Sequence, residues 1–206
     1  MQERKLMELA EAAGNIAIVG HVRPDGDCVG SCLAVCNYIT EQYPEKTVDV
    51  YLETPPAKFS YLKQFERICS DPDTGNQYDL CICLDSGDRE RLGKNVVYLN
   101  TAKTSICIDH HITNQGYAAA NFVKADASAT CEALYDFLDE EKISRDVAEC
   151  IYTGILHDTN VFKNSNTTQR TMQVAGAMMA KGINFSRIID ESFYRKTYVQ
   201  NQIMGR

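Results

Sequence analysis

Histidine and aspartate residues gather in four short segments of this 206-residue chain. Each of the four histidines lies within a few residues of an aspartate, and such mixed sets of carboxylates and imidazoles suit metal binding or proton transfer. Three segments hold the histidines and the other holds a single aspartate. The segments contain, in order, His21, Asp25 and Asp27; Asp85; Asp109, His110 and His111; and His157 and Asp158.

The aspartates Asp25, Asp27, Asp85 and Asp158 would repel one another if the fold brought them within a few ångströms. Two divalent cations would cancel these four charges. Carboxylates and imidazoles without a thiolate favour a borderline-hard ion, so we expect Mn²⁺, with Mg²⁺, Co²⁺ or Zn²⁺ as alternatives. The sequence therefore predicts a site for two metal ions.

Each segment also has a plain structural explanation. Asp25-Gly26-Asp27 is a common turn sequence, His157 fits a packed helix histidine, and residues 85–88 fit a capped turn between a strand and a helix. These explanations would have to hold independently in four places at once. The combination therefore favours a shared functional site.

The surrounding hydrophobic pattern predicts an α/β fold with a parallel β-sheet flanked by helices and a helical carboxy-terminal portion. Because the carboxyl ends of parallel strands meet at one edge, the polar segments that follow the strands should converge there. We expect strands at 16–19, 47–52, 79–85, 96–99 and 105–108, and helices near 6–13, 28–43, 133–138, 147–155, 168–181 and 185–194.

Composition excludes several classes of protein. The net charge of -7 opposes binding to long nucleic acid, and no run of 18 apolar residues is present, so we expect neither a membrane span nor a signal peptide. Nine cysteines, an odd number, include two within a strand-like run, which indicates reduced thiols and a cytoplasmic protein. Cys28, Cys32 and Cys36 could present thiols to a soft metal, but without a CxxC pair we expect them to be small buried side chains.

Through the four segments of histidine and aspartate residues described above, the sequence resembles the DHH phosphoesterases. Among the branches of that family it is most similar to the bacterial bifunctional oligoribonuclease (nanoRNase) and 3′-phosphoadenosine 5′-phosphate (PAP) phosphatase group, through residues 85–92 and 157–168. The family motifs are His-x-x-Pro-Asp-Gly-Asp-x-x-Gly-Ser at 21–31, Leu84-Asp85, Asp109-His110-His111, and Gly154-x-x-x-Asp158-Thr159.

The resemblance implies a ligand set for two Mn²⁺ ions. His21, Asp25 and Asp85 would bind one ion, and Asp27, Asp85, His110 and Asp158 the other, with Asp85 as the bridge. His111 would face the phosphate and Asp109 would orient the histidines. His157 is outside the family's ligand set, so we expect it to be a packing residue. Asn160 stands where many relatives have Gly, a mild departure because Asn tolerates left-handed backbone.

The implied activity is Mn-dependent hydrolysis, in which two ions activate one water for in-line attack on phosphorus. Substrates would be short oligoribonucleotides or nucleotide phosphates such as PAP. The alternatives are a cyclic-dinucleotide or linear-dinucleotide phosphodiesterase, a pyrophosphatase, and a catalytically silent nucleotide-binding module.

We expect residues 1–206 to form one catalytic domain, because the glycine-rich, histidine-containing motif of the family's second, substrate-binding (DHHA1-type) domain is absent from this sequence. Monomer and homodimer are both compatible with the sequence.

Overall fold

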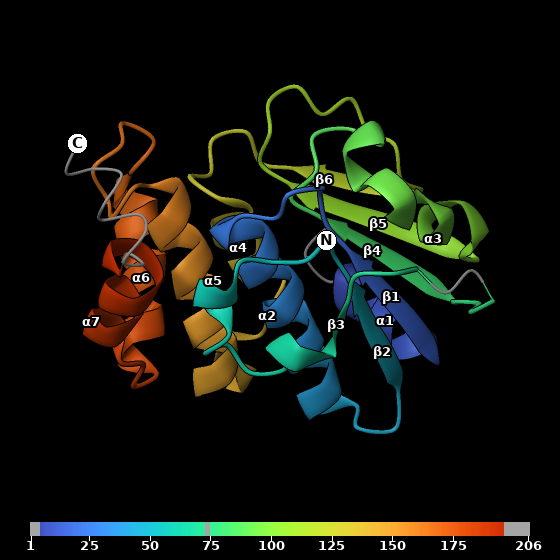
Figure 1. The fold of residues 1–206 in the computed structure, drawn as a ribbon, viewed down its shortest axis with the longest axis horizontal. Coiled ribbons are helices and arrows are strands. Elements are labelled where there is room, and N and C mark those ends of the chain that lie inside the picture. Colours follow the sequence, from blue (N-terminus) through green and yellow to red (C-terminus); the bar gives the residue numbers. More distant parts are fainter. Residues whose placement is uncertain (1–4, 73–74, 196–206) are drawn as a thin grey trace.

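A central parallel sheet organises the protein, whose computed structural model describes residues 5–72 and 75–195 (Figure 1). The strand order is β3-β2-β1-β4-β5-β6, and every neighbouring pair is parallel. The order reverses between β1 and β4, so the connections from these two strands lead in opposite directions along the sheet. The strands are β1 Asn15–Val19, β2 Thr47–Tyr51, β3 Ile68–Cys69, β4 Leu80–Leu84, β5 Thr104–Asp109 and β6 Ala120–Val123.

Helices cover both faces of this sheet (Figure 1). Alternate residues of β1 point to opposite faces, so Ile16 and Ile18 belong to one apolar core and Ala17 and Val19 to the other. The larger core contains residues of α1, α2, α4, α5 and α6, and the smaller one contains Tyr98 of α3. The helices are α1 Lys5–Ala12, α2 Gly26–Gln42, α3 Val96–Thr101, α4 Thr130–Tyr135, α5 Arg145–Asp158, α6 Gln169–Ala180 and α7 Phe185–Ile188, and a π-helical turn follows at Ile189–Tyr194.

The α/β fold class is confirmed, but one predicted strand is wrong. Residues 96–99 lie in helix α3 rather than in a strand. Their β-branched and aromatic side chains favour a strand locally, but β4 and β5 are adjacent and parallel, so the chain between them must cross back over the sheet. The short strands β3 and β6, which form the two edges, were not predicted.

The cysteines have the expected surroundings. Eight of the nine are buried and unpaired, among them Cys28, Cys32 and Cys36, whereas Cys69 is exposed. Each thiol therefore packs as a small apolar group in the core, apart from Cys69. Within residues 5–72 and 75–195, every helix is too short or too polar to cross a bilayer.

Candidate metal centre

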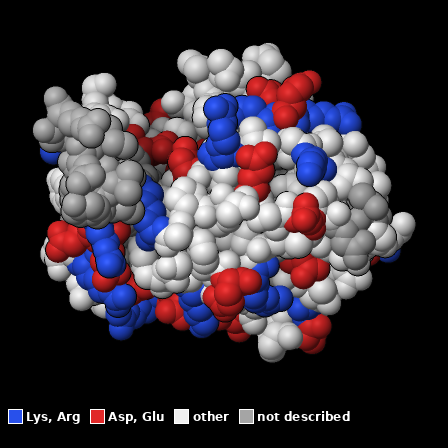
Figure 2. All heavy atoms as spheres, viewed as in Figure 1, with Lys and Arg blue, Asp and Glu red and all other residues white. Residues whose placement is uncertain are grey.

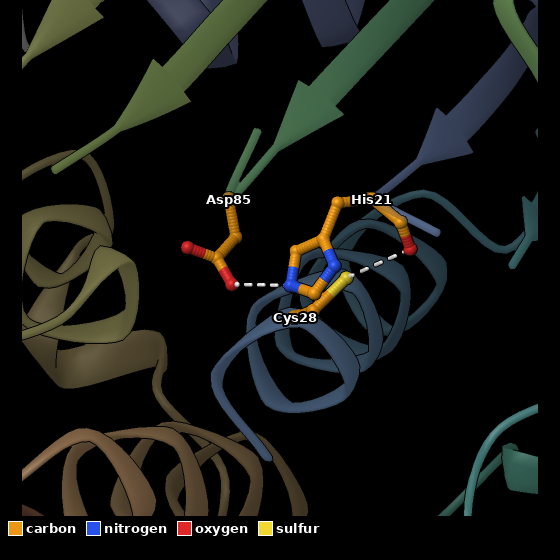
Figure 3. Close-up of side chains that lie close together, drawn as sticks. All are labelled: His21, Cys28 and Asp85. Atoms are coloured by element: carbon orange, nitrogen blue, oxygen red, sulfur yellow. Dashed lines mark hydrogen bonds and ion pairs between the residues drawn. The ribbon is translucent and has the colours of Figure 1, made fainter. Parts of the chain in front are cut away.

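The predicted site residues meet at the carboxyl edge of the sheet, where the strand order reverses. His21 follows β1, Asp85 follows β4, and Asp109 ends β5. The Nε2 atom of His21 lies 3.4 Å from Asp85 Oδ2 and 3.7 Å from Asp25 Oδ2. Figure 3 shows the imidazole of His21 pointing toward the carboxylate of Asp85. The first expected group of ligands is thus close together.

A second group adjoins the first through Asp85. His110 Nε2 lies 3.2 Å from Asp158 Oδ2 and 3.8 Å from Asp85 Oδ1. One ligand atom each from Asp27, His110 and Asp158 lies within 4.8 Å of the other two. Asp85 therefore faces both groups, one with each carboxylate oxygen.

Helix capping orients the carboxylate of Asp25, and an unusual backbone conformation orients that of Asp85. Asp25 is the N-cap of α2 and accepts hydrogen bonds from the N–H groups of Asp27 and Cys28 through Oδ1, which leaves Oδ2 toward His21. Asp85 has a φ of 55°, a left-handed conformation that is strained for a residue with a Cβ. Strain of this kind at a convergence of polar groups is typical of a functional site.

The buried carboxylate of Asp27 is fixed by the start of α4. Its Oδ2 accepts the N–H of Thr130 at 2.6 Å and its Oδ1 accepts the N–H of Cys131 at 3.0 Å. The hydroxyl of Thr130 also donates to Asp85 Oδ1 at 2.9 Å. Gly154 of α5 permits this approach, because a Cβ there would lie 2.5 Å from Asp27 Oδ1 and 2.3 Å from Cys131 Sγ.

The third motif forms a hydrogen-bonded chain around the buried Asp109. His111 Nδ1 lies 2.8 Å from Asp109 Oδ1, and Asn114 donates to Asp109 Oδ2 at 2.8 Å. The bond fixes the ring of His111 through Nδ1 and leaves Nε2 unused by Asp109. Asn114 and Thr130 are site residues that the sequence did not reveal, since each acts through a contact formed only in the fold.

The electrostatics of the cluster favour an added cation. Burial alone would lower the pKa of both His21 and His110, but hydrogen bonds to Asp25, Asp85 and Asp158 outweigh it, and the pKa of His110 rises to about 10. Burial raises the pKa of Asp27 and of Asp158, and repulsion by Asp85 adds to both. Protons bound to these histidines and aspartates thus offset the negative charge that divalent ions would otherwise neutralise. The carboxylate oxygens and imidazole nitrogens of the cluster are ligand atoms that suit such ions.

Cys28 also lies beside the first group, as Figure 3 shows. A ligand atom of His21, the Sγ of Cys28 and a carboxylate oxygen of Asp85 are all within 4.8 Å of one another. Burial raises the pKa of the Cys28 thiol, however, so the uncharged form is favoured. The thiol therefore packs under the site as a neutral group.

The fourth histidine packs as expected. The ring of His157 stacks edge-on against Phe59, with centroids 5.0 Å apart, and its Nε2 lies 3.1 Å from Ser192 Oγ. Burial, followed by the positive charge of Lys58, lowers the pKa of His157 to about 4. Asn160 has a φ of 50°, the left-handed conformation expected where relatives have Gly.

Comparison with known proteins shows the family to which this chain belongs. Residues 15–155 match the DHH family, N-terminal domain. The chain belongs to the DHH family. It is 30% identical over 184 residues to the bifunctional oligoribonuclease and PAP phosphatase NrnA of Bacillus subtilis, covering 87% of this chain and 57% of that protein. It is 31% identical over 187 residues to the probable NrnA of Streptococcus mutans, covering 90% of this chain and 58% of that protein. The chain thus spans little more than half the length of these relatives.

Solved structures show the same fold. An exopolyphosphatase-related protein from Bacteroides fragilis superposes with a TM-score of 0.89 at 24% identity, covering 99% of this chain and 63% of that one. A putative family II inorganic pyrophosphatase from Methanococcus jannaschii gives a TM-score of 0.59 at 18% identity, covering 85% of this chain and 60% of that one. These likenesses support the architecture.

Proposed function

We propose that this protein is a Mn²⁺-dependent phosphohydrolase that cleaves short oligoribonucleotides and removes phosphate from PAP. The observation that carries the proposal is the position of Asp85 between two groups of metal-binding side chains. Relatives named for both activities match most of the chain, which supports the choice of substrates.

The proposed ligand set is the one that the resemblance to the DHH family implies. His21, Asp25 and Asp85 would hold one divalent ion, and Asp27, Asp85, His110 and Asp158 the other. Bound in this way, the ions would supply an activated water and positive charge for the phosphoryl group.

The remaining side chains hold these groups in place. Thr130 fixes one oxygen of Asp85, and the first N–H groups of α4 fix Asp27. His111, held at Nδ1 by Asp109, would turn Nε2 toward the phosphate. The protein thereby orients the reacting phosphate without a covalent nucleophile of its own.

Surface charge supports a short substrate. On the face drawn in Figure 2, acidic and basic side chains are interspersed and form no continuous basic surface. A long polyanion gains affinity mainly by releasing counterions along such a surface, so we expect weak binding of long nucleic acid. The cytoplasmic location, the single-domain assignment of residues 1–206 and the choice between monomer and homodimer stay predictions.

The test is hydrolysis of a two-nucleotide RNA and of PAP with added Mn²⁺, compared between the wild type and Asp85→Asn. We expect the variant to lose turnover while its circular dichroism spectrum is retained. The exposed Asp190→Asn is the matched control and should keep wild-type turnover. Undiminished hydrolysis by Asp85→Asn, or by the wild type after exhaustive chelation, would contradict the proposal. A cyclic dinucleotide in the same panel separates the alternative phosphodiesterase.

A further inference from the structure

A hollow of about 600 Å³ continues the carboxyl edge of the sheet beyond the metal centre. Its lining comes from three consecutive connections: Arg23 and Pro24 after β1, Glu53 and Pro56 after β2, and Ser70 and Asp71 after β3. The metal centre occupies the same edge over β1, β4 and β5. The hollow and the metal centre are therefore neighbours that share the connection after β1.

That shared connection joins the two directly. Pro24 lines the hollow, and the next residue is Asp25, which faces His21. Arg23 has a φ of 55°, and its N–H donates to Glu53 Oε2 at 2.8 Å, so the loop is held against the connection after β2. A group bound between the metal-binding side chains would reach the hollow across Pro24.

The chemistry of the lining suits a nucleoside. Two proline rings offer apolar surface, and the hydroxyls of Thr54 and Ser70 and two carboxylates offer acceptors for ribose hydroxyls or base amino groups. The carboxylates of Glu53 and Asp71 disfavour a phosphate dianion inside the hollow. A volume of this size falls within the range of small-molecule sites.

Two cationic residues belong to the same connections: Arg23, which lines the hollow, and Lys58, which follows β2. Lys58 follows Pro56 by two residues, lies 4.9 Å from the centroid of the Phe59 ring, and is near enough to Asp25 and His157 to influence both electrostatically. Among the described residues, no carboxylate forms an ion pair with Lys58 or with the guanidinium of Arg23. Both are therefore free to contact an anion that arrives at the metal centre.

We propose that this hollow is a subsite for the nucleoside attached to the reacting phosphate, with Arg23 and Lys58 contacting the phosphate. The inference rests on the proposed function and adds the place in the fold where the nucleoside of the substrate binds. The hollow lies within the part of the chain described here, over β1 to β3.

The test measures binding rather than turnover, by calorimetry of purified protein with Mn²⁺ and two probes, AMP and inorganic phosphate. The nucleoside contribution is the ratio of the two dissociation constants. Ser70→Trp, which fills the hollow from an exposed position, should reduce the preference for AMP about tenfold, equivalent to about 1.4 kcal/mol. Ser186→Trp, on α7, is the control for a surface tryptophan and should keep the wild-type ratio.

Lys58→Gln tests the proposed contact with phosphate. We expect both probes to bind about three- to fivefold more weakly, because both contain phosphate, and Lys58→Arg to restore binding. Lys63→Gln is the control, since Lys63 pairs with Glu41 and Asp146 instead. Melting curves that match the wild type show that each variant is folded.

The outcomes separate the two proposals. An AMP preference that survives Ser70→Trp, or a wild type that binds AMP no more tightly than phosphate, overturns the subsite while leaving hydrolysis intact. Loss of the AMP preference in Ser70→Trp supports the subsite, even if the wild type fails to hydrolyse dinucleotides and the proposed function is wrong.

Discussion

Two glycines in helix interiors should respond in opposite ways to the same substitution. Gly154 lies in α5 and Gly176 in α6. Alanine is favoured over glycine in a helix by about 1 kcal/mol, so each change would stabilise the protein if nothing else mattered. A Cβ at Gly176 meets no heavy atom within 4 Å, and Gly176→Ala should therefore gain about 0.5 to 1 kcal/mol.

Gly154→Ala differs because of what surrounds it. A Cβ there would lie 2.3 Å from Cys131 Sγ and 2.5 Å from Asp27 Oδ1, whereas ordinary contacts between such atoms are about 3.5 to 4 Å. Neither neighbour can retreat easily, because Cys131 is buried and its N–H holds Asp27. Overpacking of this kind costs about 1 to 3 kcal/mol, so the two variants should differ in unfolding free energy by about that amount.

Urea denaturation of the wild type and both variants measures the difference, and a manganese titration of the melting temperature adds a second readout. Displacing Asp27 should also reduce the stabilisation by Mn²⁺ in Gly154→Ala, but not in Gly176→Ala. If Gly154→Ala were as stable as Gly176→Ala and responded equally to Mn²⁺, the close packing of α5 against Asp27 would be refuted.

Three further outcomes can be measured directly. Added Mn²⁺ should raise the melting temperature of the wild type, and an unchanged melting curve across the titration would argue against a preformed site. Asp109→Asn should lower kcat about 10- to 100-fold, because the ring of His111 would no longer be held by Asp109. A variant with the kcat of the wild type would show that Asp109 does not orient His111. Asp79 accepts hydrogen bonds from the ammonium group of Lys103 and from the backbone N–H groups of Asn15 and Gly14, and these lower its pKa to about 2. Because this folded pKa is below the unfolded value, Asp79 stabilises the protein above about pH 4. The difference in melting temperature between wild type and Asp79→Asn should therefore shrink as pH falls toward 2.

The convergence of the polar segments could be predicted from the sequence, whereas parts of the sheet could not. Residues at the ends of buried strands, such as His21 and Asp85, must meet once the strands are parallel, so their convergence follows from local patterns. Helix α3 was mistaken for a strand because Val96 and Val97 favour extended backbone, and only the crossover between β4 and β5 decides otherwise. The alternating pattern of a strand can be recognised only over several residues. Strand β3 has two residues, so its sequence shows no such pattern.

The supporting residues of the site were beyond prediction for a different reason. Thr130 reaches Asp85 across 45 positions of sequence and Asp27 across 103. Nothing near Thr130 in the chain signals either contact, since both depend on where the fold places the start of α4 relative to α2 and to the end of β4. Asn114 bonds to Asp109 only five positions away, yet it does so through a turn that returns to the end of β5. Such partners are visible only when tertiary structure is known.

The strand order has a consequence for biosynthesis. Chain growth from the amino terminus delivers β1 and β2 to the ribosome exit well before β4, although β1 needs β4 on its other side. Non-local parallel pairing is slow, and the central strand has an unpaired edge until residue 84 has emerged. Asp158 emerges later still, at the end of α5, so a nascent chain would expose its carboxylates until residue 158 has emerged and a cation can be enclosed.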